Sequence, residues 1–179
     1  MSGIGTQEKK QKGLYRPEFE HGSCGIGFVA NLKGRKDHSI VTNALHMLSR
    51  MEHRGGTGFD IKSGDGAGIL LQMPHAFFME ACITANIELP AFAEYGVAMT
   101  FFPQDEAKRH ECKAIFEHNI KKIGLELLGY RIVPVDNSDL GQSSKATEPS
   151  IQQVFIKRPA KMEVDVFERK LFVVRNFTT

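Results

Sequence analysis

The sequence has few cysteines, no long apolar run and almost no excess of charge. Its three cysteines, Cys24, Cys82 and Cys112, are odd in number and far apart, so they suit neither a disulfide framework nor a zinc site. No stretch approaches the ~20 apolar residues of a transmembrane helix, and the N-terminus lacks the apolar core of a secretory signal. These absences predict a cytoplasmic protein with reduced thiols and no membrane partner.

The net charge of +2 indicates no particular macromolecular partner. Lys9, Lys10 and Lys12 form the one dense basic cluster. Such an N-terminal run is typical of a solvated tail, with nucleic-acid binding as the alternative, and we expect no nucleic-acid partner. A chain of 179 residues, 41% of them hydrophobic, can form one domain with a core. No Cys/His cluster has the spacing of metal ligands, so no metal site is predicted.

Hydrophobic periodicity predicts a mixed, layered α/β or α+β domain. Apolar residues alternate or form short runs in the predicted strands, and they recur at helical spacing in the predicted helices. The predicted strands are residues 25–32, 67–73, 95–102, 127–134 and 151–157. The predicted helices are residues 38–53, 75–86, 105–123 and 163–175, and residues 136–149 are predicted to form a loop. The helix over 105–123 is expected to bury Ala107, Cys112, Ile115, Phe116 and Ile120.

Cys24 stands at the start of the first predicted strand, between Ser23 and Gly25. A cysteine there is commonly a small buried residue, but small neighbours let a substrate approach the thiol closely. The preceding segment is polar and could be discarded, which would make Cys24 a new N-terminus. A free α-amino group, with a pKa of about 7.7–8, can then accept the thiol proton and activate the sulfur. The sequence therefore predicts an N-terminal nucleophile, with a core cysteine as the alternative.

The stretch from Arg54 to Gly68 is rich in glycine and joins a predicted helix to a predicted strand. Arg54, which precedes Gly55 and Gly56, is either a solvated helix-end residue or a cation that stabilises a carboxylate or a neighbouring loop. The segment from Ser63 to Gly68 predicts a tight turn that Asp65 caps or braces. It matches neither a Walker A loop nor a dinucleotide fingerprint, so a phosphate-binding role is not favoured.

Three motifs together resemble the N-terminal glutamine amidotransferase domain of the glutamate synthase large subunit, in its bacterial form. The motifs are LYRPEFEHGSCGIGF at 14–28, MEHRGGTG at 51–58 and SGDGAGILLQMP at 63–74. The resemblance implies an α+β fold of the N-terminal nucleophile type, a four-layer αββα sandwich that is incomplete in this chain. It also implies a propeptide over 1–23 and the N-terminal part of a class II amidotransferase domain over 24–179.

The same resemblance implies a glutaminase that hydrolyses L-glutamine through a cysteine thioester and delivers ammonia for glutamate synthesis from 2-oxoglutarate. Cys24 matches the nucleophile, Arg54 and Gly55 match the HRG motif beside it, and Asp65 and Gly66 match a supporting turn. No cofactor is implied for this chain. FMN and an iron–sulfur cluster are implied for the full-length enzyme, whose partners are its synthase domains and a small NAD(P)H-dependent subunit.

Departures from the family pattern predict a truncated chain, or fragment. The family's oxyanion Asn-Gly pair and the later Arg and Asp that hold glutamine are absent, and residues 176–179 are expected to interrupt the last helix. Loss of one oxyanion donor can lower a rate by ~10²–10³, so the chain alone is expected to be inactive. The alternatives are a non-catalytic interaction or regulatory module that keeps the fold, and a different class II amidotransferase.

Overall fold

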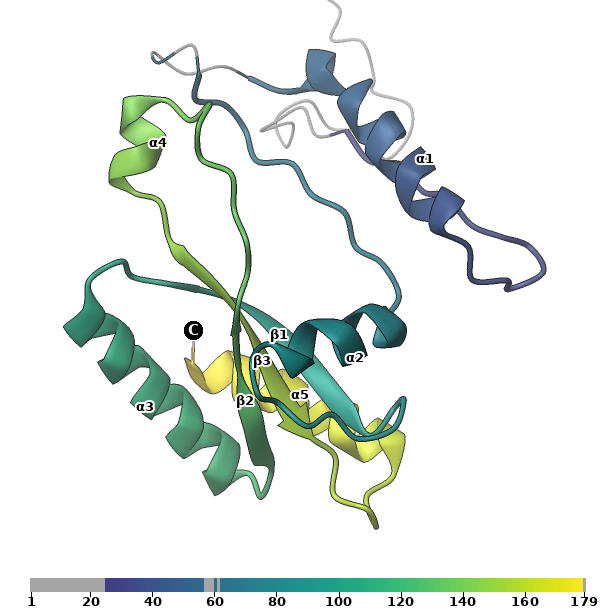
Figure 1. Cartoon of the computed structure of the whole chain (residues 1–179), viewed down its shortest axis with the longest axis vertical. Helices are drawn as coiled ribbons and strands as arrows, with labels where there is room; N and C mark the ends of the chain where they lie inside the picture. The colour runs from purple at the N-terminus through teal and green to yellow at the C-terminus, as the bar shows by residue number, and fades with distance from the viewer. Residues whose placement is uncertain (1–24, 57–59, 61, 179) are drawn as a thin grey trace, which may run out of the picture. The chain divides into compact units, whose positions relative to one another are not determined.

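The computed structural model describes residues 25–56, 60 and 62–178, which fall into two compact units (Figure 1). The described residues of unit 1 come from Met1–Thr57 and Gly64–Ile69, and those of unit 2 come from Gly58–Ser63 and Leu70–Thr179. Among the described residues, the helices are α1 (His38–Ser49), η2 (Glu52–Arg54, a 3-10 helix), α2 (His75–Ile83), α3 (Glu106–Lys122), α4 (Gln142–Ala146) and α5 (Val164–Thr178). None of these helices is long and apolar enough to cross a membrane.

Unit 2 is built on a three-stranded antiparallel sheet in the order β1-β3-β2. The strands are β1 (Tyr95–Phe102), β2 (Glu126–Ile132) and β3 (Ser150–Lys157). β3 is paired along both edges, with Lys157 opposite Tyr95 on one side and opposite Glu126 on the other. β3 is buried from Gln152 to Ile156, so side chains that point to both faces are buried, including two glutamines as well as Val154, Phe155 and Ile156.

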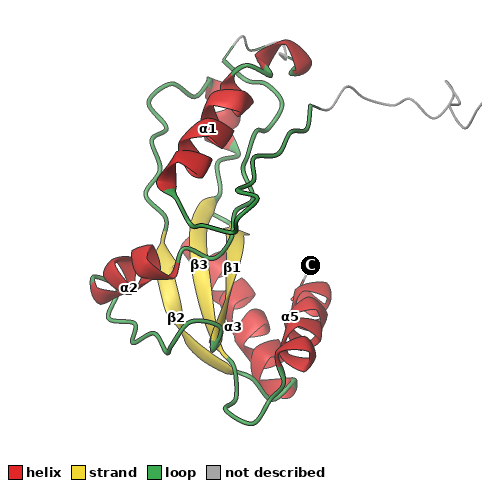
Figure 2. Ribbon diagram, turned by 90° about the vertical axis from the view of Figure 1, so that its right-hand side faces the viewer, coloured by secondary structure: helices red, strands yellow, loops and turns green. Residues whose placement is uncertain are grey.

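Helices cover both faces of this sheet (Figure 2). Val154 and Ile156 of β3 project to the face covered by α3 and α5, where they join a buried cluster with Phe116 and Phe167. Phe155, one position between them, projects to the opposite face and packs with residues of α2 and β1. The period of two along the strand therefore separates two hydrophobic cores, one on each face.

Most predicted elements of unit 2 are confirmed, because capping and periodicity are local signals. β1 occupies the residues predicted for it, and β2, β3, α2, α3 and α5 lie within a few residues of their predicted ranges. Asp105 begins α3 as its N-cap, accepting a hydrogen bond from the Lys108 N–H at 2.8 Å. In unit 1, Asp37 begins α1 in the same way, accepting from the Ser39 N–H at 2.7 Å.

The predicted strands over 25–32 and 67–73 are wrong: neither segment is assigned to a sheet among the described residues. Most of their apolar side chains are exposed, with Phe28 at 90% and Leu70 at 102%. A strand needs hydrogen bonds from a partner strand, and alternation in the sequence cannot supply one. The α+β class is correct, but the described residues hold one sheet of the implied αββα sandwich, so the fold is incomplete.

Helix boundaries and faces account for the other differences. α1 ends at Ser49 rather than 53, where the Ser49 hydroxyl donates to the His46 carbonyl and a 3-10 turn follows. Residues 136–149 are not all loop, since they include α4. Ala107 and Ile115 are exposed and Cys112 is half-buried, because α3 turns mainly Phe116, Asn119 and Ile120 inward. α5 continues to Thr178, so residues 176–178 do not interrupt it.

Candidate functional site

The two glycine-rich motifs meet in unit 1 through a reciprocal pair of hydrogen bonds. The Gly56 N–H donates to Oδ2 of Asp65 at 2.8 Å, and the Asp65 N–H donates to the Gly56 carbonyl oxygen at 3.0 Å. A carboxylate that accepts a backbone N–H forms a charge-assisted bond, which is stronger than a neutral one. Asp65 therefore braces the end of the HRGG segment against the start of the SGDG turn, which brings two motifs together that the sequence only places in order.

Gly64 permits this close approach. A Cβ added at Gly64 would lie 2.9 Å from the Gly56 carbonyl oxygen, a backbone atom that cannot turn aside as a side chain does. By contrast, a Cβ at Gly66 would meet nothing within 4 Å. The glycine at position 64 is therefore required by the contact between the motifs, whereas the glycine at position 66 is not required by any neighbour in the described structure.

We call the reciprocal pair of hydrogen bonds between Gly56 and Asp65 the bracket. Gly64→Ala should break it, because the forced overlap with the Gly56 carbonyl oxygen costs about 1–3 kcal/mol of stability. We expect the Asp65 amide to exchange with solvent deuterium roughly tenfold faster or more in this variant, because about 1.4 kcal/mol corresponds to a factor of ten. Gly66→Ala is the matched control from the same motif and should leave that exchange rate unchanged. Equal effects of the two substitutions would contradict the assigned role of Gly64.

The structure describes the other predicted site residues to different extents. Cys24 lies outside the described residues, so its predicted role as nucleophile is not tested by the structure. The backbone of Arg54 ends η2, but its side chain is outside the described part. Gly55 follows as the C-cap and donates its N–H to the Glu52 carbonyl oxygen at 2.9 Å. The backbone around Arg54 is thus held in a 3-10 turn beside the bracket of Gly56 and Asp65.

The described cysteines differ in exposure. Cys82 is 1% exposed in the core beneath α2, and this burial raises the pKa of its thiol, although nearby Arg131 partly offsets the effect. A buried thiol with a raised pKa stays protonated and is a poor nucleophile. Cys112 is half-buried on α3. Cys82 is therefore a structural residue, and the prediction that Cys24 is the nucleophile stays a prediction.

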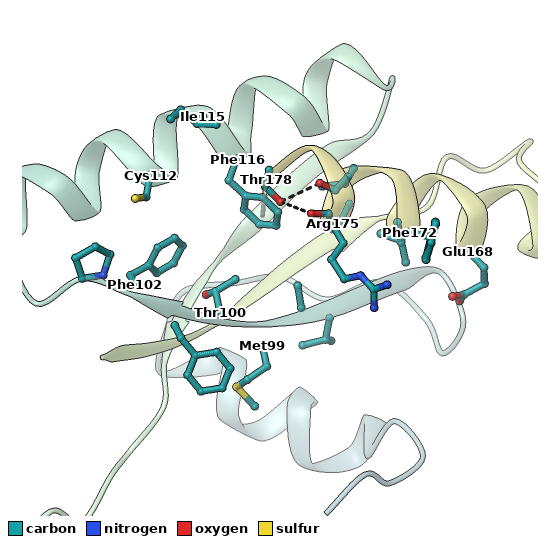
Figure 3. Close-up of a pocket in the computed structure, with 17 residues that line it drawn as sticks. Met99, Thr100, Phe102, Cys112, Ile115, Phe116, Glu168, Phe172, Arg175 and Thr178 are labelled. Atoms are coloured by element: carbon teal, nitrogen blue, oxygen red, sulfur yellow. Dashed lines mark hydrogen bonds between the residues drawn. The ribbon is translucent and has the colours of Figure 1, made fainter. Parts of the chain in front are cut away.

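A groove of about 750 Å³ opens in unit 2 between β1, α3 and α5 (Figure 3). None of the predicted site residues lines it, and its lining is mostly apolar. The hydroxyl of Thr178 at its edge donates back to the carbonyl oxygens of its own helix at Val174 and Arg175. In the part of the chain that the structure describes, no group of three or more His, Cys, Asp or Glu side chains could hold a metal ion. The groove is thus mainly apolar, with Cys112, Glu168 and Arg175 among the residues that line it.

Sequence reasoning missed one polar cluster next to the SGDG turn. Asp60 and Ser63 hydrogen-bond with Ser143 and Ser144, about 80 residues further along the chain. Neither serine belongs to a motif, and a contact between distant loops leaves no periodic signal. Ser63 itself opens the SGDG turn, which was the only sequence signal available.

The family model of class-II glutamine amidotransferases matches residues 24–179. Because this match spans most of the sequence, the chain belongs to that family. The structure agrees with this assignment in its α+β class and in the antiparallel sheet of unit 2. The family membership inferred from the three motifs is therefore confirmed.

The relatives are glutamate synthases. The chain is 45% identical over 171 residues to the "Glutamate synthase [NADPH] large chain" of Bacillus subtilis, which covers 95% of this chain and 11% of that protein. It is 39% identical over 172 residues to the "Glutamate synthase [NADH]" of Schizosaccharomyces pombe, and the aligned region covers 93% of this chain and 8% of that protein. It is 42% identical over 156 residues to "Ferredoxin-dependent glutamate synthase 2, chloroplastic" of Arabidopsis thaliana, and the aligned region covers 87% of this chain and 10% of that protein. The chain thus spans about a tenth of the length of these relatives.

Proposed function

We propose that this chain supplies the part of a glutaminase site that contains the nucleophile, and that Cys24 is this nucleophile. The observation that carries the proposal is the family match, whose first matched residue is Cys24. The bracket between Gly56 and Asp65 supports it, because it joins two of the three motifs on which the resemblance depends. Arg54 and Gly55 are assigned to the wall beside the nucleophile, and Asp65 with Gly66 to its supporting turn.

The proposed reaction begins when residues 1–23 are removed and the α-amino group of Cys24 becomes free. This amine takes the thiol proton, and the sulfur attacks the side-chain amide carbon of L-glutamine. The C–N bond then breaks, the amine returns the proton to the departing nitrogen, and ammonia leaves behind a γ-glutamyl thioester. Water attacks the thioester, which releases glutamate and restores the thiol. A separate histidine base is not needed, because the amine titrates near neutral pH.

The names of the relatives support a larger setting for this chemistry. We propose that the ammonia serves glutamate synthesis from 2-oxoglutarate in synthase domains of the kind that glutamate synthases carry, with FMN and an iron–sulfur cluster held there and not in this chain. The relatives' names specify different electron donors: NADPH, NADH or ferredoxin. A small NAD(P)H-dependent subunit is therefore not common to all of them, and we propose it as the partner of the protein that contains this chain. A cytoplasmic location, suggested by three cysteines without disulfide spacing, is part of the same proposal.

Labelling by a diazoketone analogue of L-glutamine tests the proposal directly. We expect the full chain, after expression, to show an intact mass that lacks residues 1–23 and to gain one adduct at Cys24. The adduct should form faster at Cys24 than at Cys112, because a freed α-amino group activates the Cys24 thiol and Cys112 carries no such base. The readouts are intact mass and peptide mapping.

Two variants separate the outcomes of this labelling. Cys24→Ala should remove the adduct, and Cys112→Ala should leave it unchanged. Glutamine turnover by the chain alone is expected to stay undetectable, and brisk turnover would overturn that part of the proposal. Labelling mainly at Cys112 would instead favour the non-catalytic interaction module.

A further inference from the structure

The two edge strands of the sheet in unit 2 differ in how they are protected against pairing with another chain. β2, on one edge, carries the charged residues Glu126 and Arg131, and its pairing is bulged between Leu127 and Gly129. Charges and bulges are the features by which edge strands resist the addition of a further strand. β1, on the other edge, has the sequence YGVAMTFF, with neither a charge nor a proline. β1 is therefore the edge that lacks these protections.

The backbone of β1 directs hydrogen-bonding groups away from β3. The Arg158 N–H donates to the Glu94 carbonyl oxygen at 2.8 Å, one pair beyond the start of β1, so the backbone of Glu94 faces β3. Orientation alternates along a strand, so Val97, Met99 and Phe101 direct their N–H and C=O groups to the opposite edge. None of the hydrogen bonds among the described residues uses these groups. The side chains of Met99 and Phe101 are 51% and 65% exposed, so both positions can pair with an added strand.

The apolar groove lies beside this edge and extends the surface that a partner could cover. Large apolar side chains that line the groove stay half exposed or more, namely Met99, Phe101, Ile115 and Phe172. They come from β1, α3 and α5, so three elements contribute to one apolar surface. Exposed apolar side chains that gather in one place mark an interaction surface. The edge of β1 and the groove therefore form one candidate interface.

The wall of the groove on α5 carries two opposite charges. Glu168 and Arg175 both line the groove, and Phe172 lies between them along the helix (Figure 3). Their separation of two helical turns corresponds to about 10 Å along the axis. The guanidinium carbon of Arg175 lies 4.9 Å from the centroid of the Phe172 ring. The wall therefore presents a negative end, an aromatic centre and a positive end.

We propose that a second copy of this chain pairs its β1 antiparallel to the first β1, which forms a two-fold symmetric dimer with one continuous sheet. The two-fold axis brings the same patch of both copies together and sets the two α5 helices in opposite directions. Glu168 of each copy then faces Arg175 of the other, with the two Phe172 rings between these pairs. A partner with charge of a single sign would match only one of the two groups, which is why we assign the interface to a second copy. The pairing does not depend on the proposed chemistry of Cys24.

Sedimentation equilibrium of the full chain tests the dimer, in a reductant that excludes disulfide-linked pairs. We expect a monomer–dimer equilibrium with a dissociation constant in the micromolar range, at the weak end for interfaces of ordinary size. Met99→Lys should raise this constant about tenfold or more, because each copy then adds a like charge to the shared edge. Ile132→Lys is the matched control, since Ile132 is 74% exposed on β2 at the opposite edge, and it should leave the constant unchanged.

Charge reversal on α5 distinguishes the two-fold arrangement from any other pairing. Glu168→Arg and Arg175→Glu should each raise the dissociation constant about tenfold, because like charges then face each other across the axis. The double variant should restore the wild-type value, since each pair is again of opposite sign. Far-ultraviolet circular dichroism checks that every variant is folded.

Three results would contradict the proposal. A wild-type chain that stays monomeric up to about 500 µM, well above a micromolar dissociation constant, would overturn the dimer. Equal weakening by Met99→Lys and Ile132→Lys would overturn the assignment of the interface to the edge of β1. A double reversal on α5 that fails to restore the dimer would overturn the facing of Glu168 and Arg175.

Discussion

Phe155→Ala is expected to lower the free energy of unfolding of the sheet unit by about 3–5 kcal/mol, the usual cost of removing a buried phenylalanine ring. Phe155 is 0% exposed in the central strand. Its ring meets Phe78 of α2 edge-on at 5.3 Å between centroids and lies 6.2 Å from Tyr95 of β1. Domains are stable by only about 5–15 kcal/mol in total, so this one truncation should remove a large part of the stability. Urea unfolding followed by far-ultraviolet circular dichroism measures the change.

Phe101→Ala is the matched control, because Phe101 belongs to the same sheet but is 65% exposed. Its truncation should cost less than about 1 kcal/mol, as expected for a surface residue. If Phe155→Ala yields no folded protein, Phe155→Leu keeps most of the volume and should cost less than Phe155→Ala while still exceeding Phe101→Ala. Equal unfolding midpoints for the wild type and both Phe155 variants would contradict the two-core description of unit 2.

Amide exchange should differ by roughly a thousandfold or more between residues 25–32 of unit 1 and the sheet of unit 2. Phe155 and its neighbours are paired on both sides and buried, so their amides should exchange only through unfolding of unit 2. Residues 25–32 have no described strand partner, and none of the described residues of unit 1 is fully buried. An opening free energy near 5 kcal/mol on one side and near zero on the other gives this ratio.

Exchange measured by mass spectrometry on peptides from 25–36 and 150–157 tests this contrast, with peptides from α3 as an internal control that should resemble the sheet. Uniform protection across the chain would show that residues 25–32 are paired in solution, and it would restore the strand predicted for them. The outcome bears on function, because Cys24 directly precedes this segment. A loosely held segment would explain poor turnover even with an intact thiol.

The chemistry of the candidate site was predictable mainly as a set of motifs. Cys24, the HRGG segment and the SGDG turn were identified from residue types, their order and the resemblance they carry; the family match confirms the family, and the roles of these residues stay predictions. Their mutual geometry was not predictable, because the contact between Gly56 and Asp65 depends on how the intervening residues fold back. The hydrogen bond between Ser63 and Ser143 was missed for the same reason, since a bond between residues 80 apart has no local signature.

The sequence by itself determined what depends on neighbours along the chain. Asp105 predicted where α3 begins, and the apolar residues of 151–157 predicted the strand β3, because capping and periodicity act between near neighbours along the chain. Only the tertiary structure decided which extended segments became strands and which face of α3 became core. Residues 25–32 alternate as a strand does, yet no strand among the described residues pairs with them, and a strand forms only where a second strand satisfies its backbone hydrogen bonds.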